Sequence, residues 1–199
     1  MKQLRKIWVL ILCAALVCLV AAYLVWRTSP TLSAERNQEA SMGYNKLMIH
    51  FGLPGTTRTN LHYPEGYGGA YIGKDDILVI QITDKAGEEF SRKALSEIME
   101  LRLFKIRRVK HSFNELVTEN NAIGSYNPWL DPETGKPRPK PDAYFDGKIV
   151  QNGIDTKNNS VVVWLRDISP ESIEAFREYV SDAPFVKFEL AVGEGPVLQ

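Results

Sequence analysis

Few side chains in this sequence are of a type and at a spacing that would support catalysis or metal binding. The 3 histidines, His50, His62 and His111, are far apart, and no His-x-x-x-His or His-Glu-x-x-His spacing supplies a nucleus for a zinc site. The 2 cysteines, Cys13 and Cys18, both lie in an apolar N-terminal run. Cysteine–zinc sites, disulfides and thiol catalysis are therefore excluded from the rest of the chain, and we expect no metal and no cofactor.

Sequence motifs of the common enzyme classes are also missing. The chain has no Gly-x-Ser-x-Gly elbow, no Gly-x-Gly-x-x-Gly and no phosphate-binding Gly-Lys-Ser/Thr. The acidic pair Asp75–Asp76 lacks the alternating ligands and fixed glycine of a calcium loop. We predict a protein that is not an enzyme. The alternative is a hydrolase, which would need His62 or His111 beside a partly buried carboxylate.

The N-terminal segment predicts a membrane anchor. Residues 7–26 are an unbroken apolar run of 20 residues. At about 1.5 Å per residue, such a helix spans roughly 30 Å, the hydrocarbon core of a bilayer. Because Lys2, Arg5 and Lys6 precede the run, we expect a single-pass signal-anchor in the cell membrane, with a cytoplasmic N-terminus and the following domain outside. The alternative is a signal peptide cleaved before Ala34, which would release a secreted domain.

The charge balance argues against nucleic-acid binding. The chain has 24 basic and 24 acidic residues, but the first 33 residues hold four of the basic ones and no acid. The remaining domain is therefore weakly acidic, whereas nucleic-acid binding depends on neutralising phosphates. A basic run of Lys105, Arg107, Arg108 and Lys110 would either meet anionic head groups or an acidic partner, or lie solvated on a sheet edge.

The domain outside the anchor reads as two similar halves. In the first half, apolar periodicity and turn residues predict a helix over 35–51, a hairpin over 69–84, a helix over 88–103, a strand over 105–111 and a helix over 112–121. Ser112 and Glu115 form the capping box of the last helix. In the second half, residues 152–167 align with residues 69–84 without a gap, and a helix capped by Ser169 and a strand over 185–190 follow. We predict an α+β fold: an N-terminal transmembrane helix followed by two ferredoxin-like hairpin–helix–strand units, each with helices on one face of a mainly antiparallel sheet.

The domain boundaries follow from the same patterns. They are a signal-anchor over 1–33, a juxtamembrane helix and loop over 34–62, a first α+β unit over 63–123, a proline-rich loop over 124–147, and a second α+β unit with its tail over 148–199. Prolines fix φ and remove backbone donors, so the fourth segment is expected to be a loop or extended linker. Its aromatic residues, Tyr126, Trp129, Tyr144 and Phe145, would either anchor a partner or fold back on the core.

Two segments carry a resemblance to a known family. The first runs from Tyr63-Pro-Glu-Gly-Tyr-Gly-Gly-Ala-Tyr-Ile to Ile-Leu-Val-Ile-Gln-Ile-Thr-Asp84, and the second from Gly153 to Asp167, with Ile173-Glu-Ala-Phe176 after it. Both resemble the prodomain-like region of bacterial secreted serine proteases of the chymotrypsin and alpha-lytic type. The resemblance covers about residues 63–192. In that family the prodomain helps the protease to fold and inhibits it tightly.

The resemblance implies a prodomain without its protease, because the chain has no Gly-Asp-Ser-Gly nucleophile segment and its last residue is Gln199. The implied function is a membrane-tethered, extracytoplasmic, non-catalytic module that inhibits or helps to fold a protein partner, a secreted serine protease. The alternatives are an extracytoplasmic hydrolase and a structural or sensory cell-envelope component.

The family's prodomains also suggest where the partner would bind. They pair a sheet edge with the protease, so by resemblance the closing strand and the tail are the expected contact. The expected binding residues are Phe185, Val186, Lys187, Phe188, Glu189 and Leu190, with Trp129 and Tyr126 of the loop.

Overall fold

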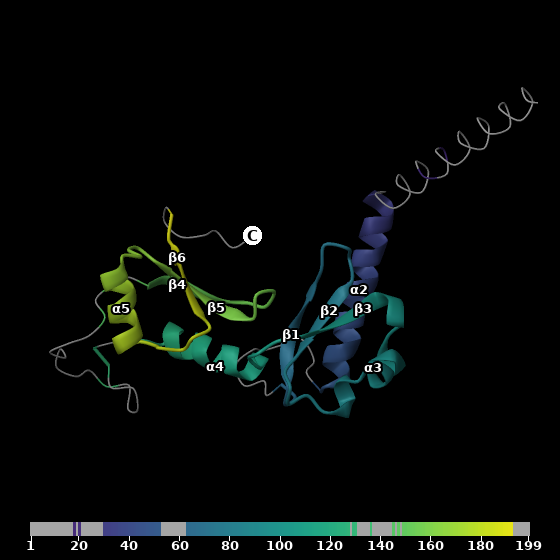
Figure 1. The fold of residues 1–199 in the computed structure, drawn as a ribbon, viewed down its shortest axis with the longest axis horizontal. Coiled ribbons are helices and arrows are strands. Elements are labelled where there is room, and N and C mark those ends of the chain that lie inside the picture. The colour runs from purple at the N-terminus through teal and green to yellow at the C-terminus, as the bar shows by residue number, and fades with distance from the viewer. Residues whose placement is uncertain are drawn as a thin grey trace, which may run out of the picture.

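The fold comes from a computed structural model, which describes residues 18, 20, 30–52, 63–127, 129–130, 136, 145, 147 and 149–192. The helices are α2 (Pro30–His50), α3 (Arg92–Ile98), α4 (Phe113–Gly124) and α5 (Pro170–Tyr179), and the strands are β1 (Tyr67–Ile72), β2 (Leu78–Ile82), β3 (Phe104–Arg108), β4 (Ile149–Asp155), β5 (Ser160–Leu165) and β6 (Val186–Leu190). They form two units, each built on one three-stranded sheet (Figure 1). The α+β class predicted from the sequence is confirmed.

Each sheet combines a hairpin with a parallel strand. In the first sheet β1 and β2 are antiparallel, and β3 runs parallel to β2. The second sheet repeats this arrangement with β4, β5 and β6. A parallel neighbour requires a crossover connection, which α3 provides in the first unit and α5 in the second. The prediction of a mainly antiparallel sheet is therefore wrong, since each sheet has one antiparallel and one parallel pair.

Helix α2 packs on the first sheet and belongs to its core. Leu47 and Met48, on the apolar face predicted from the sequence, are buried. They meet the side chains of Leu78 and Ile80 in β2 and of Leu95 in α3. Burying one such side chain stabilises the fold by about 1.5–3 kcal/mol. This core is the reason why α2 is a structural part of the first unit rather than a separate juxtamembrane segment.

Helix α4 has the same relation to the second sheet. Its residues Leu116 and Ile123 are buried in a second core with Val161, Val163 and Phe176. The predicted boundaries assigned 113–123 to the first unit, whereas the two cores group each sheet with the helix that precedes it. The repeat in the structure is therefore helix, hairpin, helix and strand.

The segment predicted as one helix over 88–103 is divided into three. Residues Glu88–Phe90 and Leu101–Leu103 form 3-10 turns on either side of α3. Ser91 has an extended backbone and its hydroxyl accepts from the N–H of Ala94, so it caps a new helix instead of continuing one. Met99 is extended as well and ends α3. The apolar periodicity predicted the burial of Phe90 and Leu95, but Leu101 is 50% exposed and the caps were not predicted.

The two hairpin turns are equivalent in conformation. Asp76 has φ 56° and Asn159 has φ 51°, and both stand at the same position of their turns. Asparagine and aspartate tolerate this left-handed region better than most residues. In the first turn the Asp76 carboxylate accepts from the Ser33 hydroxyl at 2.7 Å, which ties the turn to α2.

The predicted transmembrane segment 7–26 lies outside the described residues, apart from Cys18 and Val20. Among the helices of the described part, none combines the length and apolarity needed to cross a bilayer.

Candidate functional site

Strand β6 lies at the edge of the second sheet, with β5 on one side. The carbonyl of Phe185 accepts from the N–H of Val161 at 3.1 Å, and the N–H of Ala191 donates to the carbonyl of Leu165 at 2.8 Å. Backbone groups in a parallel ladder alternate in direction, so those of Phe188 and Leu190 face away from β5. The strand predicted to bind a partner thus presents backbone groups on its outer edge.

The side chains of β6 divide between the two faces of the sheet. Val186 is buried in the second core, and the Phe188 ring packs edge-on against Phe176 with the centroids 5.0 Å apart. Lys187 and Glu189 are exposed on the other face. Charged side chains on an edge strand discourage unspecific pairing with other chains.

The apolar surface of β6 lies at its C-terminal end. Leu190 is 50% exposed and Val192, just after the strand, is 84% exposed. Together with the outward backbone groups of Phe188 and Leu190, these side chains make up what we term the β6 edge.

The aromatic residues of the proline-rich loop have different environments. Phe145 is buried, its N–H donates to the Tyr126 hydroxyl at 3.1 Å, and Tyr126 packs against the second core. Trp129 is 46% exposed. Tyr144 lies outside the described residues. Of the two loop residues expected to bind, Tyr126 thus folds back on the core and Trp129 is on the surface.

Three residues of the basic run, Lys105, Arg107 and Arg108, are engaged by other parts of the chain. Lys105 pairs with Asp75, and Arg108 pairs with Asp84 at 2.7 Å. Arg107 donates to the carbonyl of Lys157 at 3.0 Å. These contacts favour an internal role for the run over recognition of an acidic partner.

The two described histidines, His50 and His111, contact different aromatic rings. His50 contacts the ring of Phe51, His62 is outside the described residues, and the His111 ring lies 4.4 Å from that of Phe185. Within the described ranges, no three His, Cys, Asp or Glu side chains gather as metal ligands would.

The carboxylate nearest in sequence to His111 is that of Glu115, and it serves the predicted capping box. It accepts from the Ser112 backbone N–H at 2.6 Å and from the Ser112 hydroxyl at 2.8 Å. The hydrogen bond from the Ser112 backbone N–H is the main cause that lowers the pKa of Glu115. Burial raises this pKa, but by less than that hydrogen bond lowers it. The Ser112 hydroxyl and the charges of His111 and Lys85 lower it further. A carboxylate held in this way is an N-terminal helix cap rather than a partner for a histidine base.

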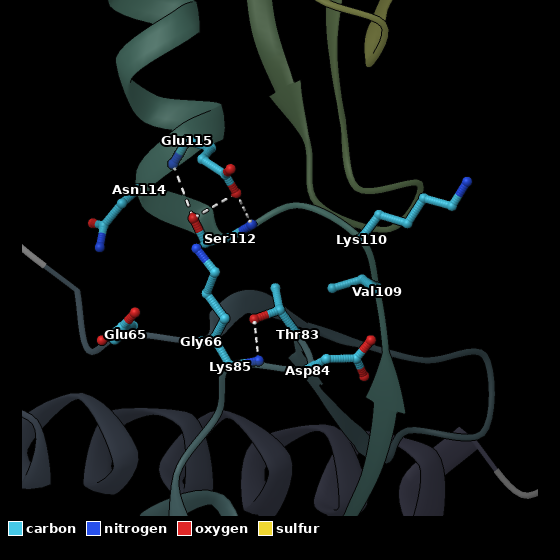
Figure 2. Close-up of a pocket in the computed structure, with 10 residues that line it drawn as sticks. All are labelled: Glu65, Gly66, Thr83, Asp84, Lys85, Val109, Lys110, Ser112, Asn114 and Glu115. Carbon is cyan, nitrogen blue, oxygen red and sulfur yellow. Dashed lines mark hydrogen bonds between the residues drawn. The ribbon is translucent and has the colours of Figure 1, made fainter.

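A cavity of about 530 Å³ lies beside this capping box (Figure 2). Its walls are the turn after β2, the linker after β3 and the first turn of α4. Figure 2 shows Lys85 extending from the turn toward Ser112, while Asp84 and Lys110 lie on the other side. Charged lining residues of both signs, Glu65, Asp84, Lys85, Lys110 and Glu115, leave no single-sign field to select a charged ligand.

A second cavity of about 470 Å³ lies between β1, α4 and β4 and has no charged side chain in its lining. Its aromatic wall includes Tyr44, Tyr63, Tyr67 and Phe113. Burial is the main cause that raises the pKa of Tyr67, and the neighbouring Tyr44 and Tyr63 add to it. Sequence analysis did not reveal this cavity, because residues from both units line it.

Comparison with known proteins supports the two-part division of the chain. A family model described as "Pro-like N-terminal domain" matches residues 30–109, and one described as "Pro-like C-terminal domain" matches residues 135–190. A search among curated proteins found no match. The first match starts where α2 starts and ends just after β3, and the second ends with β6. The matches do not specify the type of protease, and they identify residues 30–190 as containing a prodomain-like region with an N-terminal and a C-terminal part.

Proposed function

We propose that this chain is a membrane-tethered, extracytoplasmic and non-catalytic protein-binding module that acts on a secreted serine protease as an inhibitor or folding helper. The two Pro-like matches support a prodomain-like role. The commitment of Glu115 to a helix cap supports a role without catalysis. The apolar run over 7–26 supports tethering to the bilayer.

The observation that carries the proposed binding mode is the β6 edge. It lies in the part matched as the Pro-like C-terminal domain, at the edge of a sheet, and ends in the exposed Leu190 and Val192. A partner strand can add to such an edge by main-chain hydrogen bonds, while side-chain pockets supply specificity. Apolar side chains beside backbone groups that no residue of the described part pairs fit this mode.

The test changes one backbone donor of the β6 edge. Leu190→Pro removes an outward N–H at an edge position, where proline is tolerated, and its side chain is half exposed. Leu190→Ala is the matched control, since it trims the same side chain and keeps the N–H. The full chain in detergent is first used as bait on native cells, and recovered proteases are assayed for inhibition by each variant.

We expect a serine protease among the captured proteins. The inhibition constant should rise about tenfold or more for the proline variant, because one net hydrogen bond and part of a strand pairing are lost. It should rise less than about threefold for the alanine variant, which keeps the N–H. Recovery of no protease would contradict the proposed partner. Equal inhibition by the two variants would contradict strand addition at β6.

A further inference from the structure

Two asparagine side chains each bind the backbone N–H and the backbone carbonyl of one residue that is distant in the sequence. The Asn159 amide accepts from the N–H of His111 at 2.9 Å and donates to the His111 carbonyl at 2.8 Å. The Asn114 amide accepts from the N–H of Tyr63 at 3.0 Å and donates to the Tyr63 carbonyl at 2.8 Å. We term these pairs the amide clasps. Each satisfies one donor and one acceptor of the main chain, as a neighbouring strand would.

The clasps join segments that belong to different units. Asn114 is on α4, which contributes to the second core, whereas Tyr63 packs against the first core. Asn159 is in the turn between β4 and β5, whereas His111 follows β3. The Asn159 amide also donates to the carbonyl of Gly68, which lies in β1 of the first unit, at 3.5 Å. The two clasps therefore fix the second unit to the first at two separate points.

Further contacts also join the two units. The carbonyl of Lys157 accepts from Arg107 at 3.0 Å and from the fully buried Gln81 at 3.4 Å. The Phe113 ring packs edge-on against Tyr63 at 4.8 Å between centroids and takes part in both cores. A Cβ added to Gly69 would lie 2.6 Å from the side chain of Thr156. The paired main-chain groups at both clasps and the ring contact of Phe113 are typical of a fixed joint rather than a hinge, and the cavity of about 470 Å³ lies at the same interface.

The joint leads directly to the β6 edge. The His111 ring lies 4.4 Å from the Phe185 ring, and the carbonyl of Phe185 makes the first bond between β6 and β5. A displacement of His111 would thus shift Phe185, the residue just before β6.

We propose that Asn114 and Asn159 are positioning residues, which hold the two units in one orientation, and that Asn159, through His111, also sets the place of the β6 edge. The consequence for binding rests on the function proposed above, whereas the fixed orientation of the units does not. The clasps hold main-chain atoms, so the position of His111 depends on the Asn159 amide and not on the chemistry of its own imidazole.

The first variant is Asn114→Asp, which separates this role from simple helix stability. Asn114 is at the second position of α4, where a carboxylate interacts favourably with the helix dipole. The change therefore favours α4 itself, but it replaces the donor to the Tyr63 carbonyl by an oxygen.

The second variant is Asn159→Gly, which keeps a residue suited to positive φ and deletes the other clasp without adding a charge. The control is Asn45→Asp, which makes the same chemical change as the first variant at an exposed site on α2.

The measurement is the distance between spin labels on Lys93→Cys in α3 and Glu174→Cys in α5. Both sites are exposed, and Cys13 and Cys18 are replaced by serine in the full chain. We expect one narrow distance distribution for the parent and for Asn45→Asp, and a clearly broader one for Asn114→Asp and for Asn159→Gly. A narrow distribution in both clasp variants would overturn the fixed joint.

A second experiment measures the affinity of the same variants for the captured protease. We expect each clasp variant to lose about tenfold in affinity while its circular dichroism stays that of the parent. Broadened distances with unchanged affinity would overturn the positioning role. If no protease is captured, the function proposed above fails, and the spin-label distances still decide whether the joint is fixed.

Discussion

At the scale of single residues, polar side chains of this protein mostly hold backbone rather than form a reaction site. Ser112, Glu115 and Ser169 cap helices, and Asn114 and Asn159 clasp the chain of the other unit. Asp167, which matches Asp84 in the repeat, accepts from the Ser169 N–H at 2.9 Å, the main cause that lowers its pKa. These polar side chains thus stabilise helix ends and join distant backbone segments.

Gly66 is the residue whose replacement we expect to be most costly among the turn glycines. Its φ is +80°, and a Cβ there would lie 2.3 Å from the Cα of Ala86. Gly66→Ala should lower the free energy of unfolding by about 2–4 kcal/mol, from overpacking and a strained φ together. Gly52→Ala is the matched control, because φ is +69° but no atom lies within 4 Å, so it should cost only about 1 kcal/mol. Urea denaturation measures both values, and equal losses would contradict the steric argument.

The capping box gives a pH dependence whose sign is fixed. Glu115 has a folded-state pKa lowered from the ordinary value of 4.5, so its contribution is fully present above that pH and is lost as the pH falls through the folded-state pKa. Glu115→Gln keeps an oxygen acceptor without the charge. We expect the stability difference between parent and variant to shrink as the pH falls below the ordinary pKa of 4.5 and through the lower folded-state pKa. Glu119→Gln, on the same helix and outside the box, is the control, and an equal pH slope for the two variants would refute the assignment.

At the scale of elements, the repeat of helix, hairpin, helix and strand makes β3 and β6 equivalent edge strands with different chemistry. β3 carries Lys105, Arg107 and Arg108, which are engaged in contacts within the chain, whereas β6 carries one charge of each sign and ends in exposed apolar side chains. This difference is the reason for assigning the partner to β6 rather than to β3.

Removal of residues 185–199 tests this assignment at the level of the strand. The truncation deletes β6 and should abolish partner capture, because no edge remains for strand addition at that position. Trp129→Ala is the comparison, since it alters the exposed aromatic of the loop and leaves β6 in place. Capture of the protease by the truncated chain would rule out β6 as the contact. Loss of capture on replacing Trp129 would favour the structural or sensory envelope role instead.

The sequence predicts local elements well because their causes are local. The Ser112 capping box, the Ser169 cap, both hairpin turns and the buried face of α2 depend on residues within one or two turns of each other. The sequence analysis did not predict that β3 runs parallel to β2 and β6 parallel to β5, nor did it predict the two amide clasps. The clasps join residues 51 and 48 positions apart, and an exposed turn asparagine and a clasping one look alike in sequence.

At the scale of the whole molecule, the order of segments places the folded part close in sequence to the predicted tether. Helix α2 starts at Pro30, four residues after the apolar run ends at Trp26, and it is also part of the first core. A tether over 7–26 would thus continue almost directly into the folded part. Because the joint connects the first unit to the second, the tether would constrain the β6 edge as well.

The choice between a tether and a cleaved signal peptide has a structural consequence that can be measured. Cleavage before Ala34 would cut α2 within its first turn and remove Ser33, whose hydroxyl donates to Asp76 at 2.7 Å. We therefore expect the uncleaved chain to remain in the membrane pellet after an alkaline wash, and mass spectrometry to find the peptide that contains Lys2. A variant that lacks residues 2–29 should appear in the soluble fraction. A mature chain that begins at Ala34 would contradict the tether, and the β6 edge would then act from a secreted protein rather than from the membrane surface.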